Sequence, residues 1–434
     1  LSDIREAFIR VGATKLLVKR LAENDNSKNQ VYLAGSFAPT NLIPSGAPVV
    51  ETSGHGRQVL HAPMALSWLR ENGELSLAPH AKLILYPQYP EVRFSGFLRG
   101  SAGAPADLMN DRARVAGRIL FFGIRRDRTV VALVIAPTSP AARELERALA
   151  VSDRGVLHEI PLGTSDPKRE VLAKLHEISS RGWIDSVKLE PGGITKPCNS
   201  RNCGGYTLEA QFGVVPNGRA EPDYLGWELK QYGARNFTTY AAKSLVTLFT
   251  PEPTTGVYVE EGLIPFVRSY GYAALDGTVD RLNFGGAHKI NRRDARTRLT
   301  LRLEGFDHEL EKITDASGGL VLRDERDEVA AGWPFATLLG HWNRKHAQAV
   351  YVPSLLEASP QKYRFGAVCW MGEGTDFTKF LKAVSEGAIV YDPGIKVENA
   401  SSAKPKTHRR SQFRISVPKL RTLYDRFEKQ HATP

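Results

Sequence analysis

The sequence predicts a two-domain protein of α/β (α+β) class, with a mainly β domain over residues 1–160 and a mixed domain over residues 161–434. A chain of 434 residues exceeds the usual size of one domain. Its first third holds short β-prone runs between turn residues, whereas the rest alternates such runs with helical stretches. We expect the linker within residues 150–166, where two turn-rich segments bracket a short apolar run.

Three β-prone runs, at residues 30–37, 81–100 and 117–137, predict the strands of the N-terminal domain. In the C-terminal domain, strands are expected at residues 224–232, 244–250, 349–356 and 364–371, and helices at residues 165–182, 335–347 and 376–387. The first of these helices has a capping residue in Ser165 or Asp166, followed by Pro167 at its first position. This alternation predicts a mixed sheet flanked by helices.

Composition is ordinary for a soluble globular protein, with 24% charged and 42% hydrophobic residues. No apolar run approaches the roughly 20 residues that cross a membrane, so no membrane association is expected. The net charge of +11 mildly favours a polyanionic partner. The three cysteines (Cys198, Cys203 and Cys369) are too few and too irregularly spaced for a disulfide framework or a zinc site. We therefore expect free thiols in a reducing cytoplasm.

The segment WELKQY, residues 227–232, is rich in aromatic and aliphatic residues and predicts a strand. Because side chains alternate between the two faces of a strand, Glu228 and Lys230 are expected to project together. Trp227 and Leu229 would project to the opposite face and pack into the core.

A carboxylate precedes this strand, because Asp223 follows Pro222 and a turn expected at Asn217-Gly218. Two carboxylates and one ammonium would then converge on one point. Carboxylate and water oxygens are the ligands that Mg²⁺ prefers, and a nearby lysine stabilises a metal-bound hydroxide. The substrate that suits this trio is a phosphodiester. A motif this short also occurs in exposed hairpins of mixed charge, so the flanking sequence decides between the two interpretations.

Residues 204–209, GGYTLE, supply a plausible helix start at Thr207 and a further acid, Glu209. With the later Pro-Asp pair and the segment GWELK, residues 226–230, this order resembles the MvaI/BcnI family of type II restriction endonucleases. That family is related to the MutH mismatch-repair nickase and has the PD-(D/E)XK nuclease fold. The resemblance extends from about residue 168 to the C-terminus, with a catalytic core at about residues 200–260.

The resemblance implies a role for each residue of the motif. Asp223 and Glu228, with the backbone carbonyl of Leu229, would bind one or two Mg²⁺ ions. Lys230 would orient or deprotonate the attacking water, or stabilise the charge that builds on the phosphorane. Glu209 would be an outer ligand or would position a water molecule.

The resemblance also implies a DNA-recognition region at about residues 390–416, where basic residues are frequent. Arginine suits bidentate contact with guanine, and aspartate can accept a hydrogen bond from the cytosine amino group. Lysines more often contact phosphates. The expected base-recognition or supporting residues are Asp392, His408, Arg409, Arg410, Gln412 and Arg414, and the expected phosphate contacts are Lys404 and Lys406.

The function that follows is a Mg²⁺-dependent, sequence-specific endonuclease on double-stranded DNA, acting as a monomer that nicks each strand in turn in a bacterial cytoplasm. One alternative is a nicking or repair endonuclease of the MutH type. Another is a DNA-binding regulatory protein with a vestigial site, which the presence of Glu209, Asp223, Glu228 and Lys230 argues against.

The N-terminal domain lies outside what the nuclease fold needs, and it is basic and aromatic. It is similar in outline to the N-terminal effector domain of the endonucleases EcoRII and UbaLAI, which implies binding of a second DNA copy. A stabilising or protein-interaction domain is the alternative. The residues that give the domain this character are Tyr86, Tyr89, Arg93, Arg99, Arg112 and Arg118.

Overall fold

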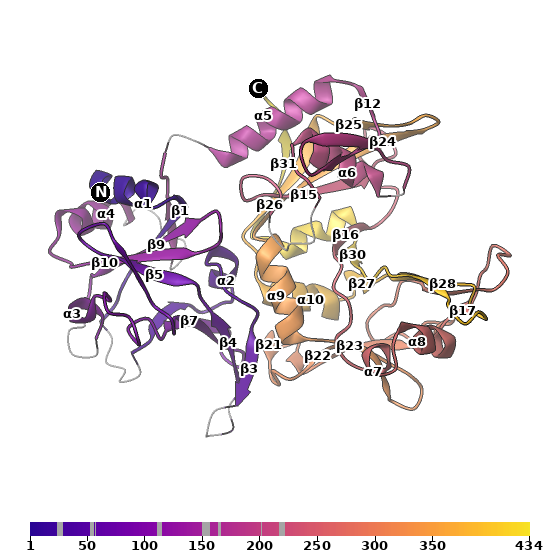
Figure 1. Cartoon of the computed structure of the whole chain (residues 1–434), viewed down its shortest axis with the longest axis horizontal. Coiled ribbons are helices and arrows are strands. Elements are labelled where there is room, and N and C mark those ends of the chain that lie inside the picture. Colours follow the sequence, from indigo (N-terminus) through magenta and orange to yellow (C-terminus); the bar gives the residue numbers. More distant parts are fainter. Residues whose placement is uncertain are drawn as a thin grey trace. The chain divides into compact units, whose positions relative to one another are not determined.

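The chain forms two compact units in the computed structural model (Figure 1). The first comprises residues 1–165 with residues 312–316, and the second comprises residues 166–311 and 317–434. No helix in the described part of the chain is long and apolar enough to cross a membrane. The structure describes residues 1–23, 29–52, 56, 58–110, 115–149, 157–163, 166–200, 202–216 and 222–434.

Strands dominate the first unit, as the sequence predicts (Figure 1). One sheet has the order β11 (His158–Ile160), β1 (Ala13–Arg20), β9 (Ile119–Arg125), β10 (Val130–Ile135), β5 (Leu66–Leu69) and β6 (Leu75–Leu77). Its neighbouring strands are antiparallel except β5 and β10, which run parallel. The second sheet is antiparallel throughout, in the order β2 (Val31–Ala34), β8 (Glu91–Ser95), β7 (Lys82–Tyr86), β4 (Gln58–Pro63) and β3 (Val49–Thr52).

Helices of this unit contribute apolar side chains to its core. Phe8 packs with Leu16 and Phe121 in a buried cluster, and its ring centroid lies 6.1 Å from that of Phe121. The helices are α1 (Ser2–Arg10), α2 (Pro39–Leu42), α3 (Ala106–Met109) and α4 (Pro140–Leu149). The cluster joins the N-terminal helix and α4 to strands β1, β5, β9, β10 and β11 of the first sheet.

The second unit is built around a mixed sheet in the order β12 (Trp183–Asp185), β25 (Gln361–Phe365), β24 (Gln348–Ala358), β26 (Val368–Glu373) and β31 (Arg426–His431). One further strand, β15 (Glu228–Gly233), pairs with β24 in parallel. The other pairings in this sheet are antiparallel. β24 is 11 residues long and contacts three strands, so it fixes the position of β15.

Two helices, α5 (Pro167–Ser180) and α6 (Cys203–Gln211), pack with this sheet in one hydrophobic cluster (Figure 1). The predicted cap of α5 is confirmed, because the Asp166 carboxylate accepts hydrogen bonds from the N–H groups of Lys168 and Arg169 at 3.0 and 3.2 Å. The cluster includes Leu175 of α5, Leu208 of α6 and Val350 of β24. Strand β15, through Leu229, is thus supported by packing on a helix-covered face.

The remaining described strands form smaller sheets. These are β16 (Val246–Phe249), β30 (Phe413–Ile415) and β27 (Ile389–Tyr391); β17 (Tyr272–Ala273), β18 (Arg281–Gly285), β28 (Gly394–Glu398) and β29 (Lys406–His408); β19 (Thr300–Glu304), β22 (Gly319–Arg323) and β23 (Val329–Pro334); and β13 (Val187–Glu190) with β14 (Ile194–Pro197). Two short strands are β20 (Phe306–Asp307) and β21 (Lys312–Ile313). The remaining helices are α7 (Val257–Glu260), α8 (Leu263–Tyr270), α9 (Phe335–Lys345), α10 (Phe377–Ser385) and η1 (Val417–Leu423).

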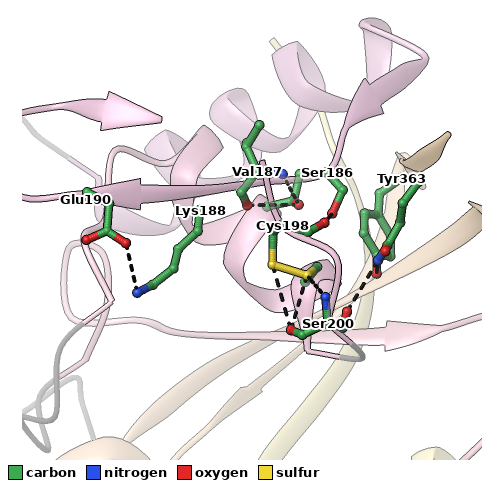
Figure 2. The surroundings of a disulfide bond; sticks show 10 residues. Ser186, Val187, Lys188, Glu190, Cys198, Ser200 and Tyr363 are labelled. Atoms are coloured by element: carbon green, nitrogen blue, oxygen red, sulfur yellow. Dashed lines mark hydrogen bonds and ion pairs between the residues drawn. A yellow bond between two sulfur atoms is a disulfide. The ribbon is translucent and has the colours of Figure 1, made fainter. Parts of the chain in front are cut away.

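The expectation of three free thiols is wrong, because Cys198 and Cys203 form a disulfide (Figure 2). Cys198 follows the end of β14, and Cys203 begins α6. Their Cα atoms lie 5.7 Å apart, within the range that a disulfide spans. Cys369 is free and buried, as expected. Disulfides are uncommon in a reducing cytoplasm, so the cysteines no longer support a cytoplasmic location. The cytoplasmic location of the protein stays a prediction.

The predicted helix start at Thr207 is also wrong, because α6 begins at Cys203 and Thr207 lies within it. Thr207 is fully buried, and its hydroxyl donates to the carbonyl of Val187 at 3.2 Å and accepts from the N–H of the same residue at 3.1 Å. The side chain that resembled a cap in the sequence therefore joins α6 to β13.

Candidate active site

The strand β15 brings Glu228 and Lys230 to one face, as their spacing predicts. The Lys230 Nζ donates to Glu228 Oε1 at 2.6 Å, and their side chains are 16% and 2% exposed. Trp227 and Leu229 project to the opposite face and belong to the hydrophobic cluster of the sheet. The alternation of side chains between the two faces of the strand therefore explains both the Lys230–Glu228 ion pair and the packing of Trp227 and Leu229 on the opposite face.

A tight turn before β15 brings Asp223 back to the strand. The Tyr224 N–H donates to the Trp227 carbonyl at 3.0 Å, and the Trp227 N–H donates to the Tyr224 carbonyl at 2.8 Å. Both central residues have positive φ, 48° at Leu225 and 83° at Gly226, which is typical of a type I′ turn. The turn occupies the start of the strand predicted over residues 224–232. The turn expected at Asn217-Gly218 lies outside the described residues.

The Asp223 carboxylate is held against the edge of β15. Its Oδ2 accepts a hydrogen bond from the backbone N–H of Leu229 at 2.8 Å. The N–H and C=O of a strand residue point toward the same edge, so the Leu229 carbonyl faces the side on which Asp223 lies. The Asp223 carboxylate and this carbonyl therefore lie along one edge of the strand, and the Glu228 carboxylate projects from its face beside Lys230.

Helix α6 carries the third acid, Glu209, and packs closely on β15. A Cβ atom at Gly204 would lie 2.7 Å from Gln231 Oε1 and 2.9 Å from Tyr363 Cε1. Only a glycine therefore permits this approach of helix and strand. Glu209 on this helix is close enough to Lys230 for its charge to raise the pKa of that lysine.

The charges of this group act on one another. Burial lowers the pKa of Lys230, but the adjacent Glu228 raises it by charge attraction and by its hydrogen bond. Asp223 and Glu209 raise it further, and the net result is a pKa above the ordinary lysine value. Lys230 is consequently a protonated cation at neutral pH.

Two tyrosines that the sequence analysis did not single out lie beside Glu228. Tyr351 pairs with Lys230 across the parallel strands, and its hydroxyl lies 2.8 Å from that of Tyr424. Burial raises the pKa of both phenols, and the charge of Glu228 contributes to each shift. The two tyrosines are therefore neutral, and their hydroxyl groups hydrogen-bond to each other near the Glu228 carboxylate. Their positions in the sequence, far from the motif, gave no signal of this role.

The donor set suits a hard divalent cation. Two carboxylates and a backbone carbonyl are oxygen ligands, which Mg²⁺ prefers together with water and substrate phosphate oxygens. No group of three or more His, Cys, Asp or Glu side chains that could hold a metal occurs within the described part of the chain. This composition fits a Mg²⁺ site completed by water and substrate better than a closed protein cage.

Four of the expected DNA-binding residues are exposed on or beside the β28–β29 hairpin, in which Lys396 pairs with His408 and Glu398 pairs with Lys406. The His408 ring lies within 3.3 Å of Glu398. The exposed residues are Lys404, Lys406, His408 and Arg409. They can meet a ligand without rearrangement.

The remaining expected DNA-binding residues contact one another or the protein core. Arg414 pairs with Asp392 at 2.5 Å and donates to the carbonyl of Leu245. The Gln412 side chain is 4% exposed and accepts from Thr247 Oγ1 at 3.2 Å. Arg410 is half-buried and donates to the same Gln412 oxygen at 3.3 Å. The structure thus separates an exposed basic group from an inner polar network, and the roles of both stay predictions.

The model of the MvaI/BcnI restriction endonuclease family matches residues 172–424, more than half of the chain. The chain belongs to this family. The predicted nuclease class is therefore confirmed, and the protein is a site-specific DNA endonuclease. The match covers most of the second unit and leaves residues 1–171 and 425–434 outside it.

Two solved structures are similar to the chain. One is the restriction endonuclease MvaI in complex with a cognate DNA substrate, with 18% identity and a TM-score of 0.46. The other is MvaI in the absence of DNA, with 17% identity and a TM-score of 0.33. Each match covers 62% of this chain and 100% of the other. No curated protein matches the chain.

Proposed function

We propose that the protein is a Mg²⁺-dependent type II restriction enzyme that hydrolyses phosphodiester bonds in double-stranded DNA. The observation that carries the proposal is the buried Lys230–Glu228 pair on β15, with Asp223 bound to the same strand edge and Glu209 acting on the same ammonium. Three acids around one protonated lysine form a polar site that suits cleavage of a polyanion.

In this proposal Asp223, Glu228 and the Leu229 carbonyl would hold Mg²⁺. The metal supplies a water of lowered pKa and positive charge beside the scissile phosphate. Lys230, being protonated, donates hydrogen bonds and stabilises negative charge developing on the phosphate oxygens. Glu209 accepts a hydrogen bond from a water molecule and orients it.

We further propose that the chain acts as a monomer and nicks the two strands in turn. The described residues contain one such group of acids and lysine, and one active site cuts one strand in each event. The exposed basic residues at Lys404, Lys406, His408 and Arg409 would contact the DNA, with phosphate contacts setting its position. Asp392, Arg410, Gln412 and Arg414 would recognise bases or hold the recognising groups in place.

The N-terminal unit is proposed as a second DNA contact. Tyr89 is 58% exposed, and the guanidinium of Arg93 stacks over the Tyr86 ring at 5.0 Å. Arg118 is 4% exposed and donates to backbone carbonyls, so it is not one of the exposed arginines of this unit. Arg112 lies outside the described residues.

The test is incubation of supercoiled and linear plasmid DNA with the protein and Mg²⁺ or EDTA, followed by sequencing of the ends. Discrete fragments that share a terminal motif would establish a site-specific cleavage reaction and give the target. A stable nicked circle that never linearises would instead establish a MutH-like nickase. Intact DNA under all conditions, including methylated and unmethylated plasmids, would contradict the proposed nuclease.

Substitution of Lys230 tests the site itself. Lys230→Ala should lower the single-turnover cleavage rate by at least about a hundredfold, because it removes a donor to the transition state. DNA binding supported by Ca²⁺ should persist. Lys243→Ala is the matched control, because this lysine is exposed on the segment that follows the same strand. Full cleavage by Lys230→Ala would refute the assignment.

A further inference from the structure

The N-terminal unit, which the family match leaves out, contains a cavity of about 300 Å³. Its walls come from the end of β1 with Lys19, from the start of β2 with Tyr32, from β8 with Arg93, and from the loops that hold Phe97 and Arg118. This volume lies at the lower end of the range for small-molecule sites. The cavity is therefore large enough for a small anion and part of the group attached to it.

Lys19 is the unusual residue of this cavity. Its side chain is 6% exposed, and no hydrogen bond or ion pair is present for its ammonium anywhere in the described residues. Among the described residues, the Lys19 ammonium makes a cation–π contact with the face of Tyr32, and its Nζ lies 5.8 Å from the ring centroid. Lys15, on the same strand, instead pairs with Glu159 at 2.7 Å. A buried ammonium without an acidic partner is costly unless a ligand provides the counter-charge.

The charges around Lys19 are mostly of its own sign. Among the described lining residues, the cationic side chains of Lys19, Arg93 and Arg118 stand against one carboxylate, Glu23, whose side chain is exposed, whereas the exposed Arg20 pairs with Glu146. Burial lowers the pKa of Lys19 to about 8, so at neutral pH it is still mainly protonated. Lys19 is therefore a buried positive charge in the wall of this cavity.

The other cations of the cavity are already held in place by protein groups. Arg93 pairs with Glu91 at 2.7 Å and donates to Gln30 at 3.2 Å. Arg118 donates to the carbonyls of Val115 and Ala22 at 2.7 and 3.4 Å. These contacts fix the guanidinium groups before any ligand arrives, which lowers the entropy cost of binding.

We propose that this cavity binds a phosphate group, with the Lys19 ammonium as its principal contact. A tetrahedral oxyanion accepts hydrogen bonds from several directions, and preset guanidinium groups with an ammonium match it better than they match a neutral ligand. The phosphate can belong to a free nucleotide or to a DNA backbone, because both present the same oxygens. The proposal does not depend on the nuclease activity of the second unit.

The first experiment titrates the full chain with sodium phosphate by isothermal calorimetry in a phosphate-free buffer at pH 7. We expect saturable binding that sodium acetate at equal ionic strength does not reproduce. Lys19→Met should weaken phosphate binding at least tenfold, whereas the control Lys15→Met should leave it unchanged. Equal binding by Lys19→Met and the unsubstituted chain, or equal binding of acetate and phosphate, would overturn the proposal.

The source of the phosphate is resolved with two more probes. Deoxyadenosine monophosphate represents a free nucleotide, and a short DNA duplex is tested with chains that carry Lys230→Ala, so that cleavage does not interfere. A loss of nucleotide affinity alone in Lys19→Met identifies a free nucleotide, and a loss of duplex affinity identifies the DNA backbone. Each result supports the site, and no loss with any phosphate probe contradicts it.

A measurement on the unsubstituted chain avoids any effect of substitution on folding. Lysines are ¹³C-methylated, and the titration of the Lys19 resonance is followed by NMR with and without phosphate. A bound anion favours the charged ammonium, so phosphate should raise this pKa toward that of the exposed lysines. An unchanged titration at saturating phosphate would overturn the proposal, whatever the plasmid assay shows.

Discussion

Replacement of Lys19 by methionine should make the N-terminal unit more stable, although it removes a charged side chain. Lys19 is 6% exposed, and burial lowers its pKa from the usual 10.5 to about 8. The folded state therefore binds this proton more weakly than the unfolded state does. Methionine has a similar length and carries no charge that must be desolvated.

The size and the pH dependence of the effect follow from the shift in pKa. A shift from 10.5 to about 8 corresponds to a stability cost on the order of 3 kcal/mol, at about 1.36 kcal/mol per pKa unit. Because the pKa of Lys19 is lower in the folded state than in the unfolded state, its full destabilising effect on the folded state is present below about pH 8. It falls as pH rises from 8 to 10.5 and is absent above that range, where the lysine is neutral in both states. The advantage of Lys19→Met should disappear over the same interval.

Pulse proteolysis in urea, with the surviving fragments identified by mass spectrometry, measures unfolding of each unit separately. We would compare the two chains at pH 7, 8, 9 and 10 in buffers without phosphate, which would stabilise the unsubstituted chain by binding. Lys15→Met is the control, because its ion pair with Glu159 is half-exposed and contributes at most about 1 kcal/mol. A destabilised Lys19→Met at pH 7, or an advantage that does not change with pH, would refute the reasoning.

Three substitutions near the active site test its construction. Gly204→Ala places a Cβ 2.9 Å from the Tyr363 ring and should destabilise the second unit by about 1–3 kcal/mol in urea unfolding, with slower plasmid cleavage. Gly205→Ala, on the same helix but with no atom within 4 Å of the new Cβ, should be neutral or stabilising. Leu225→Asn should raise the melting temperature and leave the cleavage rate unchanged, because it relieves up to about 1 kcal/mol of strain at φ 48°; a fall in melting temperature would contradict the turn assignment.

The local features of the site could be predicted from the sequence. The alternation of residues 227–230 depends only on the pleat of a strand, and it placed Glu228 and Lys230 on one face before any tertiary contact was known. The cap of α5 at Asp166 is local in the same sense, since it needs only the first turn of a helix. Such features are decided within a few residues of chain.

The features that the sequence analysis missed depend on distant segments. Tyr351 and Tyr424 meet behind Glu228 because β24 and the segment after η1 pack together, and no local pattern marks them. Gln412 resembled an exposed donor within a basic stretch, yet it is buried against Thr247. Thr207 resembled a helix cap and instead binds a neighbouring strand. Tertiary packing overrode the local preference in each case.

The proposed catalytic and recognition segments belong to different sheets. Asp223 lies before a tight turn, and Glu228 and Lys230 lie on the strand that follows it, β15, in the central mixed sheet. The hairpin of β28 and β29 lies in a separate four-stranded sheet, much later in the chain. Substitutions or insertions in that hairpin leave the spacing within residues 223–230 unaltered. Such a scaffold can diversify in the DNA it selects while the bond-breaking step is inherited intact.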